Sequence, residues 1–126
     1  FGLYGAMGVT RDDKAGRRDA FLGNYKFFGA GTGLLFWIPS DLEHGSWIDY
    51  GTFIQPISIA ARGWGLWTIA QGALGEFPHV AHRMFEIGDD YKLIGGMSIG
   101  WPDEDAPVNL FQPERLEIDE FTTWLD

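Results

Sequence analysis

The chain has 126 residues, 45% of them hydrophobic, which is enough to bury one core. Its formal net charge of −9 gives no general attraction to nucleic-acid phosphate or to anionic lipid, so we expect neither as a partner. The absence of cysteine excludes disulfides and thiolate metal sites and is compatible with a reducing compartment, so the cytoplasm is the starting expectation for its location.

Two features concern the extent of the chain. The longest apolar stretch, residues 48–61, contains Asp49, Gln55 and Pro56 and is too short and too polar to cross a membrane. The first residue is Phe1 instead of a methionine, and no signal pattern follows it. We therefore expect the start to be an interior point of a longer chain.

The first predicted elements are a helix and a strand. A helix is expected over residues 17–28, where Phe21 and Tyr25 lie on or near one face. Three closely spaced glycines then break the helix and lead into an apolar run at residues 34–38, stopped by Pro39. The short length and aromatic content of this run favour a buried strand.

A long helix should follow, beginning near Ser46, which stands three residues before Asp49 in a capping-box-like pattern. Apolar residues then recur at steps of three and four and form one stripe. Pro56 lies in the middle, where it removes a backbone hydrogen bond and clashes with the preceding turn, so we expect a kink, or a helix that ends early and restarts. Gly63 or Gly65 should end the helix.

The last part of the chain predicts one more helix, one more strand and a tail. The helix is expected over residues 78–86, with Pro78 in its first turn and Gly88 as its stop. Residues 91–101 indicate a buried strand, and the acidic tail beyond ends in apolar residues that need a surface to cover, such as that of another subunit. The order of elements predicts an α+β or α/β fold, with a sheet too small to be complete unless missing sequence or a partner adds strands.

Several candidate sites have simpler explanations. The G-x-G-x-G spacing of residues 29–33 follows a helix and precedes a strand, the reverse of a dinucleotide-binding fingerprint, so a turn explains it. His79 and His82 could share a helix face as metal ligands, but an exposed helix gives such pairs by chance, and we expect no metal. The basic cluster at residues 11–18 is interleaved with acids and fits a solvated helix entry, and Asp49 fits a cap. The spacing indicates no catalytic residue.

The glycine-rich segment at residues 65–75 is more informative. Its small residues would let the backbone approach a flat ligand, with amides pointing at it, although an ordinary glycine-rich connection explains them too. The six tryptophans allow a further interpretation as an aromatic ligand-binding surface, but most large aromatic residues in a chain of this size belong to the core.

Three stretches, residues 27–55, 60–74 and 95–121, together resemble the nitroreductase family in order and spacing. The resemblance covers nearly the whole chain and implies an α+β nitroreductase-like fold, of which residues 1–126 would be a single partial domain, the C-terminal half. Members of that family are dimeric flavoproteins that bind FMN at the subunit interface. They pass electrons from NADH or NADPH to nitroaromatics, quinones or related acceptors.

The resemblance also implies roles for particular residues. Gln71, Gly72 and Ala73 would place backbone amides against the flavin near N5, and Arg115 matches the arginine that reaches the FMN phosphate. The helix from Trp47 would lie in the core of a homodimer, and the C-terminal arm would wrap the other subunit.

Four departures from the family pattern leave a second interpretation open. Gln112 stands where a second arginine is usual, Pro56 where asparagine is usual, and Ala70 where proline is usual. The family's N-terminal arginine- and serine-containing phosphate segment, together with an asparagine- and tryptophan-containing stretch at the ring, has no counterpart here. The leading hypothesis is a fragment of an NAD(P)H-dependent oxidoreductase, and the alternative is a catalytically incompetent, truncated dimerisation module. The acceptor, which in related folds includes enoates and halogenated aromatic rings, is left open, as is the choice between NADH and NADPH.

Overall fold

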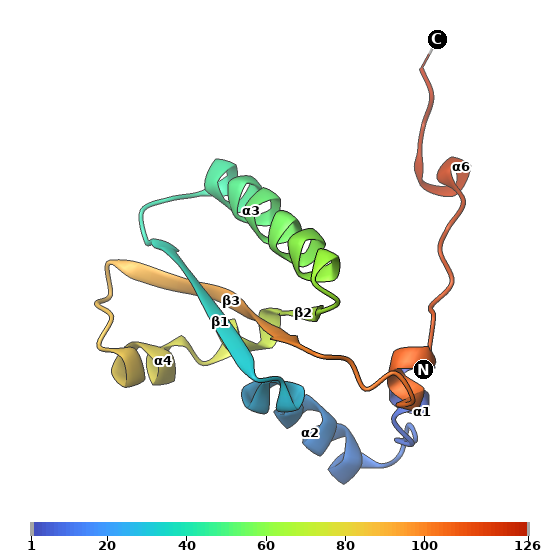
Figure 1. Cartoon of the computed structure of the whole chain (residues 1–126). Helices are drawn as coiled ribbons and strands as arrows, with labels where there is room; N and C mark the ends of the chain where they lie inside the picture. The colour runs from blue at the N-terminus through green and yellow to red at the C-terminus, as the bar shows by residue number, and fades with distance from the viewer. Residues whose placement is uncertain (1, 126) are drawn as a thin grey trace.

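The computed structural model describes residues 2–125, which are arranged around a small antiparallel sheet (Figure 1). The helical elements, with η marking a 3-10 turn, are α1 (Gly2–Ala6), α2 (Lys14–Leu22), η1 (Gly23–Gly29), α3 (His44–Gly63), η2 (Gly72–Glu76), α4 (Pro78–Phe85), α5 (Pro107–Leu110) and α6 (Ile118–Phe121). The strands are β1 (Thr32–Pro39), β2 (Trp67–Gln71) and β3 (Tyr91–Gly100). The α+β prediction, with a small sheet flanked by helices, is confirmed.

β3 is the central strand of the sheet. It pairs antiparallel with β1 on one side and with β2 on the other, in the order β1-β3-β2. Gly96 lies within the ladder with β1, opposite Leu35, and at the end of the ladder with β2, opposite Gln71. Next to it the register with β1 shifts, so that Ile94 is left without a partner in β1 and forms a bulge.

Two of the three strands were predicted and one was missed. β1 extends the apolar run at residues 34–38 at both ends, and β3 covers all but the last residue of the predicted strand at residues 91–101. β2 occupies five residues of the segment that was expected to be a glycine-rich connection. These residues carry no clear apolar–polar alternation, so their extended form is set by pairing with β3.

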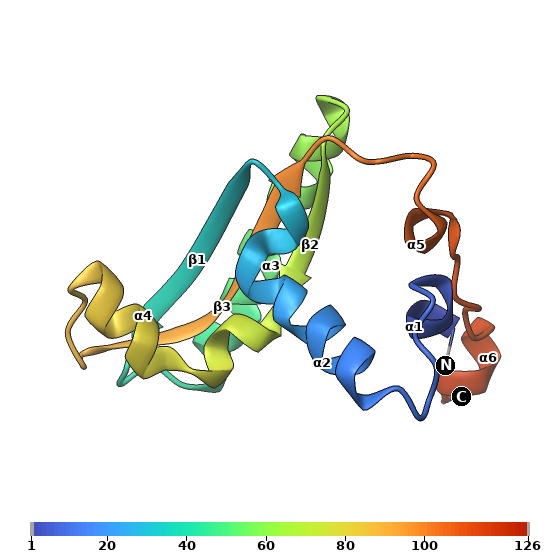
Figure 2. The same ribbon diagram turned by 90° about the horizontal axis from the view of Figure 1, so that it is seen from below.

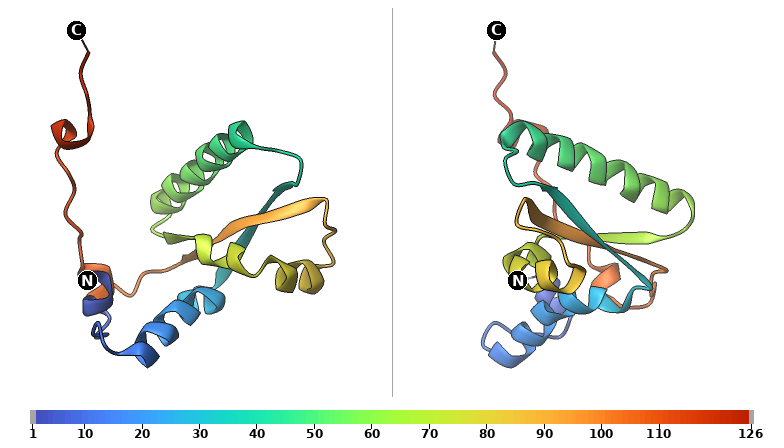
Figure 3. Two further views of the ribbon diagram at one scale, coloured as in Figure 1. Left: turned by 180° about the vertical axis from the view of Figure 1, so that it is seen from behind. Right: turned by 90° about the vertical axis from the view of Figure 1, so that its left-hand side faces the viewer.

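Helices cover both faces of the sheet. α3 lies across one face, whereas α2, η1 and α4 lie on the other (Figures 1 and 3). The side chains of β2 alternate between these layers: Thr68 donates from Oγ1 to Ser58 Oγ in α3 at 3.0 Å, and Gln71 bonds to η1 on the opposite face.

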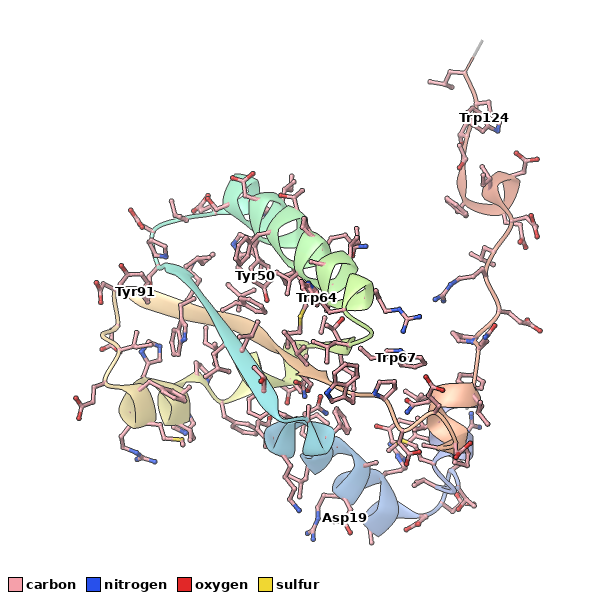
Figure 4. All side chains as sticks on the ribbon, in the orientation of Figure 1. Asp19, Tyr50, Trp64, Trp67, Tyr91 and Trp124 are labelled. Carbon is pink, nitrogen blue, oxygen red and sulfur yellow. The ribbon has the colours of Figure 1, made fainter. Side chains whose placement is uncertain are left out.

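The core has two small parts, one on each face. Its buried apolar residues are Phe36, Ala61, Leu74, Leu93 and Met97. Tyr50 of α3 packs edge-on against Phe36, with ring centroids 5.6 Å apart, between the helix and the sheet (Figure 4). Burial raises the pKa of the Tyr50 hydroxyl above its ordinary value.

α3 leaves several apolar side chains exposed, one of which, Phe53, also meets the Phe36 ring of β1 at a centroid distance of 6.1 Å. The exposed apolar side chains of this helix and its cap are Trp47, Ile48, Phe53, Ile59 and Trp64. A helix with apolar residues on both sides has a second face that is poorly matched to water. No helix within residues 2–125 is long and apolar enough to cross a membrane.

The first long helix begins and ends earlier than predicted. α2 begins at residue 14 because Asp13 caps it, its carboxylate accepting the Gly16 N–H at 2.8 Å. After Leu22 the chain tightens into η1, in which Phe27 and Phe28 have φ angles of 51° and 50°. These left-handed conformations are incompatible with a helix, so the predicted final turn is wrong.

α3 differs from the prediction at its start and at its proline. It begins at His44, so Ser46 lies inside the helix and the predicted capping box is wrong; Glu43 occupies the cap without a side-chain hydrogen bond. The helix neither ends nor restarts at Pro56, because the loss of one backbone bond leaves the packing of its inner face on the sheet intact. It ends as predicted before Gly65, whose φ of 75° is left-handed.

α4 begins as predicted, with Pro78 at its first position. The predicted stop at Gly88 is wrong by two residues. The helix ends at Phe85 because Glu86 adopts a left-handed φ of 54°, a conformation that closes a helix.

The tail follows a path of its own. α5 packs beside α1 near the start of the chain (Figure 2), and the segment beyond α5 stands away from the sheet (Figures 1 and 3). The exposed apolar side chains from the end of α5 onward are Leu110, Leu116, Ile118, Phe121, Trp124 and Leu125. Trp124 lies far from the sheet in Figure 4 and donates to Asp119 at 3.0 Å. That the tail covers another subunit stays a prediction.

Candidate functional site

The predicted ligand loop is the junction of β2 and η2. Gln71 is the last residue of the strand and Gly72 the first of the turn. The loop packs backbone to backbone on β3, since a Cβ at Gly95 would lie 2.9 Å from the Gln71 carbonyl oxygen and one at Gly75 would lie 3.0 Å from the Ile94 oxygen. Glycine at 95 is therefore required by this close approach, and a side chain at 75 would press tightly on β3.

The side chain of Gln71 points inward and is 2% exposed. Its Nε2 donates to the Asn24 carbonyl at 2.9 Å and to Asn24 Oδ1 at 3.3 Å. Its Oε1 accepts from Ser98 Oγ in β3 at 2.5 Å. The amide thus ties β2 to η1 on one side and to β3 on the other, with both of its ends occupied.

A second hydrogen bond holds the loop one residue past Gly72. The Tyr25 hydroxyl in η1 donates to the Ala73 carbonyl at 2.9 Å. Burial, and secondarily the negative charge of Glu76, raise the pKa of Tyr25 above its ordinary value. The hydroxyl therefore keeps the proton that it donates across the neutral pH range.

The outer side of Gly72 is open. A Cβ built there meets no atom within 4 Å, in contrast to the crowding at Gly75 and Gly95. Gly72 and Ala73 are also the first residues of a 3-10 turn, and such N–H groups have no acceptor within the turn. The loop is fixed from behind and accessible from the front.

Arg115, the fourth predicted site residue, lies elsewhere. It is exposed, in the extended segment between α5 and α6 that stands away from the sheet (Figure 1). Gln71, Gly72 and Ala73 are brought together by their adjacency in the chain, whereas Arg115 does not join them in this single chain.

Two hollows lie beside the sheet, and neither is lined by any of the four predicted site residues. The first, of about 430 Å³, is almost entirely apolar and lies among η1, η2, α4 and the sheet; its lining includes Leu22, Leu74, Val80, Met84 and Leu93. The second, of about 840 Å³, lies between β2, the Gly29–Gly31 turn and α5, and is lined in part by Trp67 and Trp101.

The remaining candidates have structural explanations. Among the described residues no cluster of three or more potential ligands could hold a metal. His82 approaches the Ile87 carbonyl at 2.9 Å and helps to close α4. Asp49 is not a helix cap, because α3 has already begun five residues earlier.

Sequence reasoning found the backbone of the loop but missed what holds it. Asn24 and Tyr25 precede the loop by 47 and 48 residues in the hydrogen bonds that they make with it. The one available signal was Ser98, a polar residue within a strand predicted to be buried, since a buried hydroxyl requires a hydrogen-bonding partner.

With this geometry established, similarity to known proteins becomes informative. The chain matches no protein-family model. It is 39% identical over 123 residues to a chloronitrobenzene nitroreductase of Comamonas testosteroni. It is 36% identical over 123 residues to a 4-nitrobenzoate reductase of Pseudomonas putida. Each alignment covers 98% of this chain and 54% of the relative. Its fold superimposes with a TM-score of 0.94, at 33% identity, on the FMN- and NADPH-dependent nitroreductase NfnB of Sphigopyxis sp. strain HMH, covering 98% of this chain and 56% of that one.

Over nearly its whole length the chain is similar to nitroreductases in sequence and in fold. It spans about half the length of the curated nitroreductases that it matches. That residues 1–126 form a single partial domain stays a prediction. The matched region includes the loop, its buried network and the separated tail, because it covers 98% of the chain.

Proposed function

We propose that the complete protein containing this chain is an FMN-dependent oxidoreductase that uses NADH or NADPH to reduce nitroaromatic, quinone or related acceptors. The observation that carries the proposal is Gly72, open on its outer side at the end of a strand that is clamped from behind. The relatives support it, because curated proteins similar over 98% of the chain are named for nitroaromatic reduction. The solved neighbour is described as FMN- and NADPH-dependent.

The loop residues fit a flavin. FMN would supply the hydride chemistry when bound. A flat ring needs backbone that it can approach closely, and the open side of Gly72 offers this without a side chain in the way. In the proposal the Gly72 and Ala73 amides face the N5 edge, where they orient the ring and stabilise its reduced form.

Arg115 fits the phosphate by its chemistry but not from its position within one chain. A guanidinium binds a phosphate with two parallel hydrogen bonds, and Arg115 is exposed on an extended arm. We therefore propose that the two parts of the site meet in a homodimer, in which the arm of one subunit reaches the loop of the other. The apolar outer face of α3 and the apolar end of the arm both support such an assembly.

A cytoplasmic location and an aromatic acceptor are parts of the same proposal. The absence of cysteine agrees with the first. The names of the relatives, which include a chloronitrobenzene reductase and a nitrobenzoate reductase, favour the second.

A second candidate is a dimerisation module without chemistry. Gln112, at the position where the family pattern has a second arginine, favours it, because fewer cations would then hold the phosphate. The residues of the loop favour the enzyme, since a module needs the outer face of α3 but has no use for an open, clamped Gly72.

Purification of the complete protein separates the two candidates. We expect it to carry flavin absorbance in the visible range, or to acquire it on addition of FMN, and to oxidise NADH or NADPH in the presence of a nitroaromatic compound. A complete protein that forms dimers but neither retains nor binds FMN would refute the enzyme and support the module.

A further inference from the structure

The buried side-chain amide of Gln71 has more hydrogen-bonding partners than pairing at the end of a strand requires. An amide that is 2% exposed is costly to bury unless each of its polar atoms has a partner. Here the partners come from two distant parts of the chain, Asn24 in η1 and Ser98 in β3. Apolar residues would fill the same space with less need for accurate geometry.

The hydrogen bonds fix which way the amide points. Nε2 faces two acceptors of Asn24, and Oε1 faces the Ser98 hydroxyl, so a flipped amide would lose both bonds to Asn24 and keep only the one with Ser98, whose hydroxyl would then accept. Asn24 is oriented in turn, because its Nδ2 donates to the Phe21 carbonyl at 2.8 Å. The chain of bonds therefore runs from the end of α2 through η1 and β2 to β3.

The Tyr25 hydrogen bond acts on the same backbone from the other side of Gly72. Gln71 is held through its side chain and Ala73 through its carbonyl, so the residues before and after Gly72 are both tied to η1. Gly72 itself, with no Cβ and an open outer side, has no side chain to hold it. Its peptide orientation is set by its neighbours.

We propose that Gln71, with Asn24, Ser98 and Tyr25, forms a positioning network that fixes the direction of the Gly72 and Ala73 N–H groups. The network touches no ligand and acts through the backbone of the loop. For its consequence in the holoenzyme, the proposal rests on the proposed function: the network would set how strongly the amides favour reduced over oxidised FMN.

The variants that test it each remove one bond. Ser98→Ala removes the donor to Gln71, and Tyr25→Phe removes the donor to Ala73. The matched control is Ser58→Ala, which removes the bond from Thr68 on the opposite face of the same strand. Since all three variants lose one hydrogen bond beside β2, a merely structural role predicts similar effects for them.

The first measurement needs no flavin. The backbone N–H residual dipolar couplings of Gly72 and Ala73, measured by NMR on the complete protein, should shift in Ser98→Ala and in Tyr25→Phe and keep the parent's values in Ser58→Ala, because only the first two variants release the loop. Couplings that shift equally in all three variants, or in none, would overturn the network. This outcome is independent of whether FMN binds.

The second measurement uses the FMN-loaded protein. In Ser98→Ala and Tyr25→Phe the ratio of affinities for reduced and oxidised FMN should fall by about fivefold, seen as a more negative flavin reduction potential, while Ser58→Ala keeps the parent's potential. A potential that moves equally in all three variants, or in none, would overturn the redox role. A parent that binds no FMN refutes the proposed function and this redox role with it, while the dipolar couplings still decide the network.

Discussion

Replacing Gly96 by alanine tests the packing at the centre of the sheet. A Cβ at this position would collide with the Leu34 carbonyl oxygen of β1 and lie 2.5 Å from Leu74 Cδ1 of η2. The Leu74 methyl can rotate, but the carbonyl belongs to a paired strand and moves only if β1 moves with it. Overpacking of this kind costs about 1–3 kcal/mol. For a chain of this size that corresponds to a fall of about 3–15 °C in melting temperature.

The assay is thermal unfolding followed by circular dichroism, with Gly51→Ala in α3 as the matched control. A Cβ at Gly51 meets no atom within 4 Å, and alanine is the better helix former, so this variant should gain about 0.5–1 kcal/mol. If the melting temperature of Gly96→Ala equals or exceeds that of the parent, the described contact between β1, β3 and η2 is wrong.

Three further predictions concern the loop and the arm. Because the pKa of Tyr25 is raised above 10.0 in the folded state, its contribution to stability is complete below about pH 10 and is lost as the pH rises through the raised pKa. Between about pH 8 and pH 11, the free energy of urea unfolding should fall less for Tyr25→Phe than for the parent. An equal fall would exclude this residue as a cause. Gly72→Ala should leave the melting temperature within about 1 °C of the parent's, because the added Cβ meets no other atom. The same Cβ should weaken FMN binding at least about tenfold, because it blocks the approach of the ring. Unchanged affinity would place the flavin elsewhere. Arg115→Ala should weaken FMN binding by about 10–100-fold with no change in melting temperature. Arg115→Lys should recover part of the FMN affinity, because lysine keeps the charge but cannot form two parallel hydrogen bonds. An effect on stability instead of affinity would contradict a phosphate role.

The elements that the sequence predicted well are those whose evidence is local. β1 contains a continuous apolar run and β3 is largely apolar, and Pro78 and Gly65 mark a helix start and a helix end by their own backbone restrictions. β2 is different, because its five residues become a strand only through pairing with β3, a partner about 30 residues away in the chain.

At Pro56 and Ser46, local sequence signals predicted helix ends that the folded chain does not have. Each carries a helix signal that is correct for an isolated peptide, yet α3 begins before Ser46 and continues past Pro56. Packing of Tyr50 and its neighbours against the sheet stabilises the helix more than one backbone bond does. Tertiary contacts of this kind cannot be read from the pattern around one residue.

The same division applies to the site. Gly72 could be predicted because a glycine-rich segment marks backbone that something approaches, and its open side agrees with that expectation. The inward role of the Gln71 side chain could not, because Asn24 and Ser98 meet it only after folding. That Gln71, Gly72, Ala73 and Arg115 bind a cofactor stays a prediction.

The order of the strands has a consequence for handling the chain in solution. Since β3 is central, both β1 and β2 are outer strands, and β1 presents the run Leu34–Ile38 with no charged residue to deter pairing. An uncharged, apolar outer strand of this length is the usual template for strand addition between molecules. We expect the isolated chain to aggregate through β1 on concentration or warming, and a lysine at an exposed position near the start of this strand, such as Thr32→Lys, to delay it.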